Sequence, residues 1–221
     1  MSNVYVPDAV WQVTELHKEL LIDYPGEWSV RFVLDKQALR LKEAYDEEDS
    51  AVQVQLSNWH PQCIQLSFNQ MLNQKLTLDD MRLVVAREHG FKEWEEVLSL
   101  GPVLLDEAFE TGVECMLEGD LKNLEAILKK DPQLTHRASK YAHHATMLHY
   151  LAANGVETWR QRVPANASDV ARLLIQYGAD VNATALFYGG NYTTLELLLT
   201  SAHPAAAGIA DDLADVLRSS N

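Results

Sequence analysis

Residues 146–155 read TMLHYLAANG, and residues 169–183 read DVARLLIQYGADVNA. The two stretches predict a pair of antiparallel helices. Thr146 is placed to cap the first helix with its hydroxyl group. Small alanines let the helices approach, and leucines at helical spacing fill the space between them. Gly178 follows the second helix, where a left-handed residue closes a helix without steric cost.

The pattern resembles the ankyrin repeat, a unit of two helices and a turn with the signature T-P-L-H-x-A and a period of about 33 residues. Thr146, Leu148 and His149 hold signature positions, and Met147 replaces the usual proline. The phrases LHYLAANG, RVPANA, YGGNYTTL and TSAHPAAAG look like those of a group of bacterial ankyrin-repeat proteins. The resemblance covers about residues 40 to 221 and implies a fold without a defined activity.

One such unit cannot bury its apolar faces alone, so we expect stacked neighbours. A first neighbour is predicted from helices at 106–117 and 121–130, with a tight turn at Gly119. A last unit begins at Thr193, contains a short insertion, and ends in the helix DDLADVLRSS. The region 102–221 is therefore predicted to be an ankyrin repeat domain.

The central unit carries an insertion of about ten residues between its helices, in the stretch VETWRQRVPANAS, residues 156–168, called the inserted loop below. Loops that leave a rigid scaffold often carry function. We hypothesise that the inserted loop and a finger at 187–192 flank one recognition surface or pocket. The alternative is that Trp159 and the two arginines of this loop cover helix ends and pair with local acids.

The first 101 residues are predicted to be a degenerate helical extension of the same solenoid. A helix over 7–23 is ended by Tyr24-Pro25-Gly26, and WSVRFVL is interpreted as the start of the next helix. AVQVQL alternates like a strand, but an internal echo favours a helix over 50–58. Asp49 and His60-Pro61-Gln62 recur as Asp120 and Asp131-Pro132-Gln133, 71 residues later. Thr77 is predicted to cap a further helix, and Gly101-Pro102 is the candidate boundary.

The chain carries a net charge of −14, spread over both halves. Such a field repels phosphate backbones and anionic lipid, so we expect neither nucleic acid nor a membrane as partner, and a basic protein is favoured. Cys63 and Cys115 make no disulfide framework and suit a reducing compartment. With no signal peptide and no long apolar run in sight, the sequence predicts a cytoplasmic protein.

Few residues suggest chemistry. His143 and His144 lie near His149, but adjacent side chains in an extended finger point opposite ways, and His149 is expected to bond Thr146 and nearby backbone. We see no carboxylate pair at helical spacing on an apolar face, no phosphate loop and no nucleophile elbow. The stretch YGGN at 188–191 is interpreted as a hairpin tip. No catalytic, cofactor-binding or metal-binding residue is predicted.

The fold class predicted is all-α, a helical-hairpin solenoid, and the function predicted is protein–protein binding through the concave face and the fingers, without enzyme activity. Three other functions remain open. One is an enzyme that binds a small molecule or peptide at the 155–168 loop, in a pocket formed by Asn154, Arg160, Arg162, Asn166, Tyr188 and His203. The second is an acidic inhibitor of the immunity type, which binds a basic protein in a salt-sensitive manner. The third is a purely structural role in an oligomer. The predicted partner-binding residues are Tyr141, His143, His144, Tyr150, Asn154, Trp159, Arg160, Arg162, Phe187, Tyr188 and Tyr192.

Overall fold

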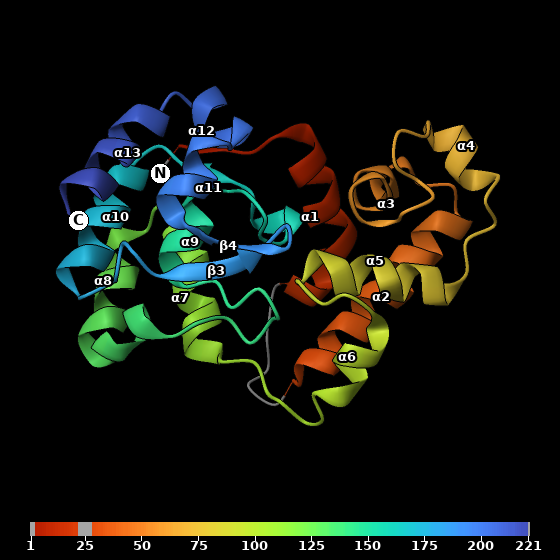
Figure 1. Ribbon diagram of the computed structural model, residues 1–221, viewed down its shortest axis with the longest axis horizontal. Helices are drawn as coiled ribbons and strands as arrows, with labels where there is room; N and C mark the ends of the chain where they lie inside the picture. The colour runs from red at the N-terminus through yellow and green to blue at the C-terminus, as the bar shows by residue number, and fades with distance from the viewer. Residues whose placement is uncertain (1–2, 22–27, 221) are drawn as a thin grey trace. The chain divides into compact units, whose positions relative to one another are not determined.

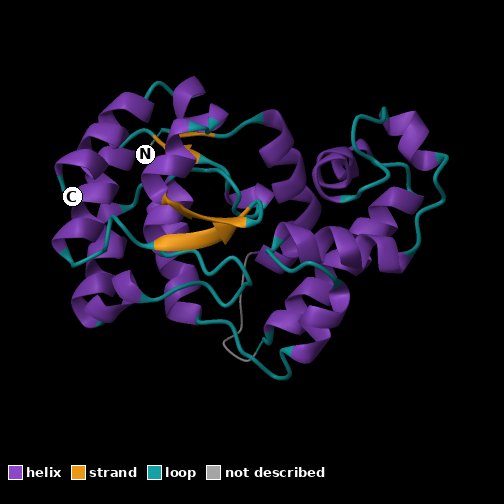
Figure 2. Cartoon of the chain, in the orientation of Figure 1, coloured by secondary structure: helices purple, strands orange, loops and turns teal. Residues whose placement is uncertain are grey.

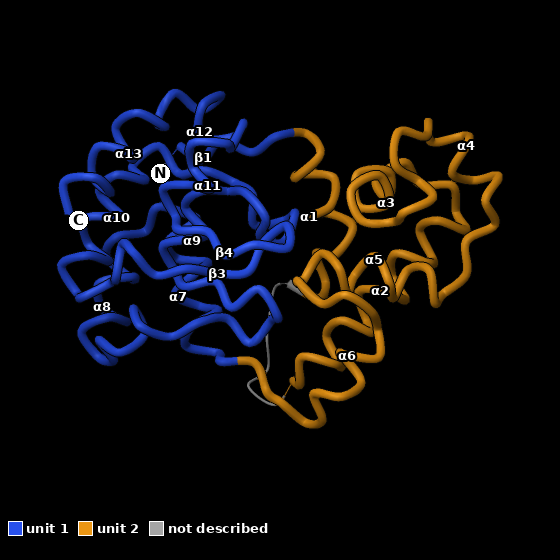
Figure 3. The backbone as a smooth tube through the Cα atoms, viewed as in Figure 1, with its two compact units in different colours: residues 1–7, 106–221 blue, residues 8–105 orange. Residues whose placement is uncertain are grey.

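The computed structural model describes residues 3–21 and 28–220 and is rich in helix (Figure 1). Thirteen α-helices, three short 3-10 helices and two pairs of short strands lie within these residues (Figure 2). The chain forms two compact units: unit 2 is residues 8–105, and unit 1 is residues 106–221 together with residues 1–7 (Figure 3). The chain is thus helix-rich, which is compatible with the predicted all-α class, and the ankyrin solenoid stays a prediction.

Unit 2 begins with two long helices that pack against each other. Ser29 caps the second by accepting a hydrogen bond from the Phe32 N–H at 3.2 Å, so WSVRFVL does lead into a helix, which begins at Val30. The predicted stop at Tyr24-Pro25-Gly26 lies outside the described residues. The stretch AVQVQL is helical, as the internal echo indicated. The elements are α1 (Asp8–Leu21), α2 (Val30–Asp46), η1 (Ser50–Val52) and α3 (Gln53–Trp59).

The rest of unit 2 adds α4 (Phe68–Leu72), α5 (Leu78–Glu88) and α6 (Trp94–Ser99). Thr77 caps α5 as predicted: its hydroxyl accepts from the Asp80 N–H, and the Asp80 carboxylate accepts from the Thr77 N–H. Helix α5 packs on α2, α3 and α6, which places it at the centre of the unit. Helix α4 was not predicted, since five residues are too few for a periodic signal.

Unit 1 contains three helix pairs. Helix α7 packs on α8, α9 on α10, and α11 on α13. The first members also touch in the order α7, α9, α11, and the second members in the order α8, α10, α13 (Figure 1). The bounds are α7 (Glu107–Leu117), α8 (Leu121–Lys130), η2 (Pro132–His136), α9 (Met147–Leu151), η3 (Thr158–Arg160), α10 (Ala167–Gln176), α11 (Thr194–Leu199), α12 (Ala202–Ala206) and α13 (Ala210–Ser219).

One apolar core runs through all three pairs of unit 1, from Phe109 in α7 to Leu217 in α13. Gly178 has a φ of 95° and ends α10 as predicted, and Gly119 turns the chain between α7 and α8 with a φ of 68°. The insertion in the last unit is partly helical, because it contains α12, which the sequence did not indicate.

Two antiparallel strand pairs complete unit 1. Strand β1 (Val4–Tyr5) pairs with β2 (Val163–Pro164) of the inserted loop. Strands β3 (Thr184–Phe187) and β4 (Gly190–Thr193) form a hairpin, which confirms the tip predicted there. Its two turn residues, Tyr188 and Gly189, have φ values of 51° and 79°, as a type I′ turn requires.

Candidate functional site

Arg160, at the end of η3 in the inserted loop, has a side chain that is fully buried. Its Nη2 lies 2.7 Å from Oε2 of Glu110 and its Nε lies 2.9 Å from Oε1 of Glu114, both on α7. Its Nη1 lies 3.6 Å from Oε1 of Glu157, and its guanidinium stands 5.4 Å from the ring centre of Tyr150. The inserted loop is therefore held to α7 through one buried cation.

Glu157 connects this cluster to the first finger, residues 136–145. The Tyr150 hydroxyl donates to Glu157 Oε1 at 3.4 Å, and His143 Nε2 lies 3.5 Å from the same oxygen. His143 Nδ1 accepts from the Ala145 N–H at 3.0 Å, so the Nε2 of this ring carries the proton that faces Glu157. The carboxylate thus links the inserted loop to both α9 and the finger.

Burial and neighbouring charge set the protonation of the cluster. Desolvation raises the pKa of the Glu110 carboxyl, although the charge of Arg160 opposes the rise. Burial alone would raise the pKa of Glu114 as well, but the charges of Arg160 and Arg162 outweigh it and lower that pKa. The carboxylates in turn raise the pKa of Arg160 well above its ordinary value, against desolvation, so Arg160 is a permanent buried cation.

The acid half of this cluster was not predicted from the sequence. Glu110 and Glu114 stand four residues apart on α7 and face the same arginine, and Glu110 is buried among the apolar residues of the core. The statement that no carboxylate pair stands at helical spacing on an apolar face was therefore wrong. The two acids were visible in the sequence, but nothing local identified the arginine about 50 residues downstream as their partner.

Arg162 extends the same anchoring toward the surface. Its Nη2 lies 2.5 Å from Glu114 Oε2 and 3.0 Å from Glu118 Oε1, and the Glu118 side chain is 59% exposed. Trp159, which directly precedes Arg160, is buried. These distances match the alternative proposed for the loop, in which its arginines pair with local acids.

The exposed part of the predicted set lies on the two fingers. His144 and Tyr188 are exposed, and each has a φ of 51°, in the left-handed region that disfavours residues other than glycine. The Leu186 N–H donates to the His143 carbonyl at 2.8 Å, so the second finger is joined to the first. The Tyr188 hydroxyl donates to Asn154 Oδ1 at 2.7 Å, which ties the tip to the end of the central unit's first helix.

The predicted partner-binding residues separate into three groups. Exposed at the finger tips are His144 and Tyr188, whereas Asn154, Arg162 and Tyr192 are half-buried. The buried members are Tyr141, His143, Tyr150, Trp159, Arg160 and Phe187. A role for the set in binding stays a prediction, and these last six side chains are not accessible at the surface.

His149 supports the first helix from inside, as expected. Its Nδ1 accepts from the Thr146 N–H at 3.1 Å and lies 2.8 Å from the Thr146 hydroxyl, while its Nε2 lies 3.2 Å from the Tyr192 carbonyl. Desolvation lowers the pKa of His149 to about 4, so the ring is neutral at pH 7. Of the residues proposed for an enzyme pocket, Asn166 donates from Nδ2 to the Gly119 carbonyl, and the Tyr188 hydroxyl donates to Asn154. The enzyme alternative stays a prediction.

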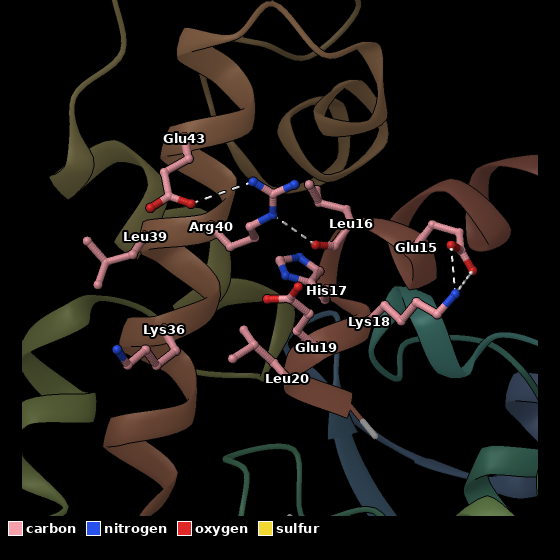
Figure 4. Close-up of a pocket in the computed structure, with 10 residues that line it drawn as sticks. All are labelled: Glu15, Leu16, His17, Lys18, Glu19, Leu20, Lys36, Leu39, Arg40 and Glu43. Atoms are coloured by element: carbon pink, nitrogen blue, oxygen red, sulfur yellow. Dashed lines mark hydrogen bonds and ion pairs between the residues drawn. The ribbon is translucent and has the colours of Figure 1, made fainter. Parts of the chain in front are cut away.

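Unit 2 has a groove of about 540 Å³ between α1 and α2 (Figure 4). Its charges are paired locally: Lys18 with Glu15 at 3.2 Å and Arg40 with Glu43 at 3.5 Å. His17 forms one wall, and burial lowers its pKa to about 4. Three acids and three bases line the groove, so it offers no net charge that would select an ionic ligand.

The described residues contain no group of three or more histidine, cysteine, aspartate or glutamate side chains able to hold a metal ion. No helix among them has the length and apolar character needed to cross a membrane. No family model matches the chain, and no similar protein was found among curated proteins or solved structures.

Proposed function

We propose that unit 1 is an ankyrin-type stack of three helical hairpins that binds another protein through its finger tips. The order of contacts supports this: α7, α9 and α11 touch in sequence, as do α8, α10 and α13. The hydrogen bond from the Leu186 N–H to the His143 carbonyl also supports the proposal, because it holds the two fingers side by side. Stacked units with aligned fingers create the extended binding surfaces of repeat proteins.

The buried Arg160 cluster contributes rigidity to this surface. Through Glu157 it holds His143, whose carbonyl bonds the second finger. A surface that is ordered before binding loses less entropy when a partner arrives. The buried part of the inserted loop, Glu157 to Arg160, then supports the finger tips from beneath and does not itself contact the partner there.

Backbone strain at the two tips also supports a binding role. His144 and Tyr188 both hold positive φ angles at exposed positions, where glycine or asparagine would fit more easily. A residue other than glycine in this region costs about 1 kcal/mol. Strain that is kept on an exposed tip is explained if the side chain is needed there, and tyrosine is frequent among the residues that dominate binding energy.

Replacing each tip residue by glycine separates binding from folding. Tyr188→Gly and His144→Gly are expected to leave stability unchanged or raise it by about 1 kcal/mol, while reducing capture of the partner in affinity purification from the source cell at least tenfold. Lys75→Gly is the matched control, because Lys75 is an exposed residue with a φ of 52° in unit 2. Equal capture by the tip variants and by Lys75→Gly would exclude the tips as the binding surface.

The net charge of −14 favours a basic partner. The same purification at two salt concentrations tests this, since long-range attraction between surface charges weakens with ionic strength. A partner that is captured equally well at low and high salt argues against charge as the source of selectivity.

A further inference from the structure

Residues 3–5 form an extended segment that lies on the inserted loop. Val4 is paired with Pro164 and Tyr5 with Val163 in an antiparallel ladder, and the Ala165 N–H donates to the Asn3 carbonyl at 2.7 Å. The segment belongs to unit 1, although the chain enters unit 2 at Asp8, three residues after Tyr5. The edge of β2 is therefore paired with a short strand that lies about 160 residues earlier in the sequence.

The pairing pattern suits main-chain recognition. Residues in an antiparallel ladder alternate between hydrogen-bonded and non-bonded pairs. Because Ala165 bonds Asn3, the next bonded pair is Val163 with Tyr5, and Pro164 falls at the non-bonded position opposite Val4. A proline has no N–H to donate, and at this position none is required.

The accepting edge is held in place by contacts other than the strand. Arg162, just before β2, pairs with Glu114 and Glu118 of α7. Asn166, just after β2, donates from Nδ2 to the Gly119 carbonyl at 3.0 Å. Val163 and Pro164 are buried, and β2 contacts α7 directly. The edge is thus anchored on both sides to α7.

The strand itself has few anchors of its own. It is two residues long, and its Tyr5 and the following Val6 are 37% and 38% exposed. Segments with little buried apolar surface and few hydrogen bonds open locally at low free-energy cost. Because β2 is anchored to α7 and β1 is held weakly, another extended segment could replace β1 on the edge of β2.

We propose that the β2 edge, Val163 to Ala165, is a binding site for an extended segment of a partner protein, which adds as a strand, and that residues 3–5 occupy this site internally in its absence. This mode relies on main-chain hydrogen bonds for affinity and on alternate side chains for specificity. Half-buried Val4 shows which position of the incoming segment faces the protein, and a β-branched residue fits there. The inference rests on the proposed function, in that it assigns a second contact to the same protein-binding unit.

A peptide with the sequence of residues 3–7, Asn-Val-Tyr-Val-Pro, tests the site in trans on the full chain. Tyr5→Pro removes the N–H that the bonded pair with Val163 uses, so it should release the internal strand. Val6→Pro is the matched control, because Val6 lies beyond the ladder. We expect the peptide to shift the amide resonances of Val163 and Ala165 in Tyr5→Pro, with at least about tenfold higher affinity than in Val6→Pro, the factor that one hydrogen bond of ordinary strength supplies.

The amide exchange of Ala165 should also be faster in Tyr5→Pro and be slowed again by the peptide. If Tyr5→Pro does not fold, the flexible double variant Val4→Gly with Tyr5→Gly replaces it, with the same expected results. Folded variants that fail to bind the peptide at Val163 and Ala165 would overturn the proposal. That failure is distinct from failure of the proposed function, because the peptide assay does not involve the finger tips.

Discussion

Removing the buried cation tests how the inserted loop is held. Arg160→Met leaves Glu110 and Glu157 buried at 1% and 0% exposure without the cation that lies 2.7 Å and 3.6 Å from them. Removing one partner of a buried ion pair costs about 3–5 kcal/mol, because an uncompensated charge remains in the interior. With a urea dependence of about 2 kcal/mol per molar for a unit of this size, the unfolding midpoint of unit 1 should fall by about 1.5–2.5 M.

Arg162→Met is the control from the same loop. Arg162 pairs with Glu114 and Glu118, whose side chains are 34% and 59% exposed, so water screens these pairs more than those of Arg160 with Glu110 and Glu157, and their loss should cost less, about 1 kcal/mol. Trp159 is the one tryptophan of five that lies in unit 1. Fluorine NMR of protein labelled with 5-fluorotryptophan, followed through a urea titration, therefore reports unfolding of this unit separately.

A second variant checks the electrostatic reasoning. Adding Glu110→Gln to Arg160→Met removes one of the two stranded charges and should recover about 1–2 kcal/mol of the loss. The reasoning is refuted if Arg160→Met lowers the midpoint no more than Arg162→Met, or if Glu110→Gln adds to the loss. Either result would mean that the cluster is reached by water and carries little of the stability of the unit.

Three further predictions follow from burial and close packing. The pKa of His149 is about 4 in the fold against 6.5 for a free ring, so the neutral ring stabilises the fold fully above pH 6.5. The free energy of unfolding should fall by about 3 kcal/mol as the pH drops to 4, because the unfolded chain binds the proton more tightly. His149→Gln, which preserves the cap, should flatten this pH dependence in urea titrations at several pH values. Burial raises the pKa of Glu110, so this carboxyl group contributes most to the free energy of unfolding at a pH below the ordinary carboxyl pKa, and its contribution declines as the pH rises. The single variant Glu110→Gln should therefore gain stability relative to the native chain as the pH increases. Gly155→Ala places a Cβ 2.6 Å from the Phe187 ring at a φ of 80°, whereas Gly189 has a φ of 79° and open space around it. Gly155→Ala should therefore lower the free energy of unfolding by about 2 kcal/mol more than Gly189→Ala. Equal thermal denaturation midpoints for the two variants would contradict the close contact.

The helix pairs of unit 1 and several turns were predictable because their signals are local. Thr77, Gly119 and Gly178 each act within a few residues of their own position, as caps or turn residues do. Repeated helical spacing located α8 at its observed bounds and α7 and α10 to within one or two residues. The hairpin at 188–191 was found from its turn residues alone.

The buried cluster was not predictable, since it depends on contacts between distant residues. Arginine in a polar loop indicates a solvated residue, and only the fold brings Arg160 to Glu110 on α7. Helix α12 and strand β1 were missed for another reason, because segments of five and two residues are too short for a periodic pattern. The tip of the second finger was predicted as a hairpin turn, but the backbone strain at both tips required coordinates.

Site-specific photo-crosslinking at the second finger tests the binding surface most directly. A photoreactive phenylalanine derivative is placed at Tyr188, and in a separate protein at Arg172, which is exposed on α10. In the source cell, we expect a discrete cross-linked protein partner at position 188 and none at position 172. Cross-linking at 172 with none at 188 would contradict a partner surface at the finger tips.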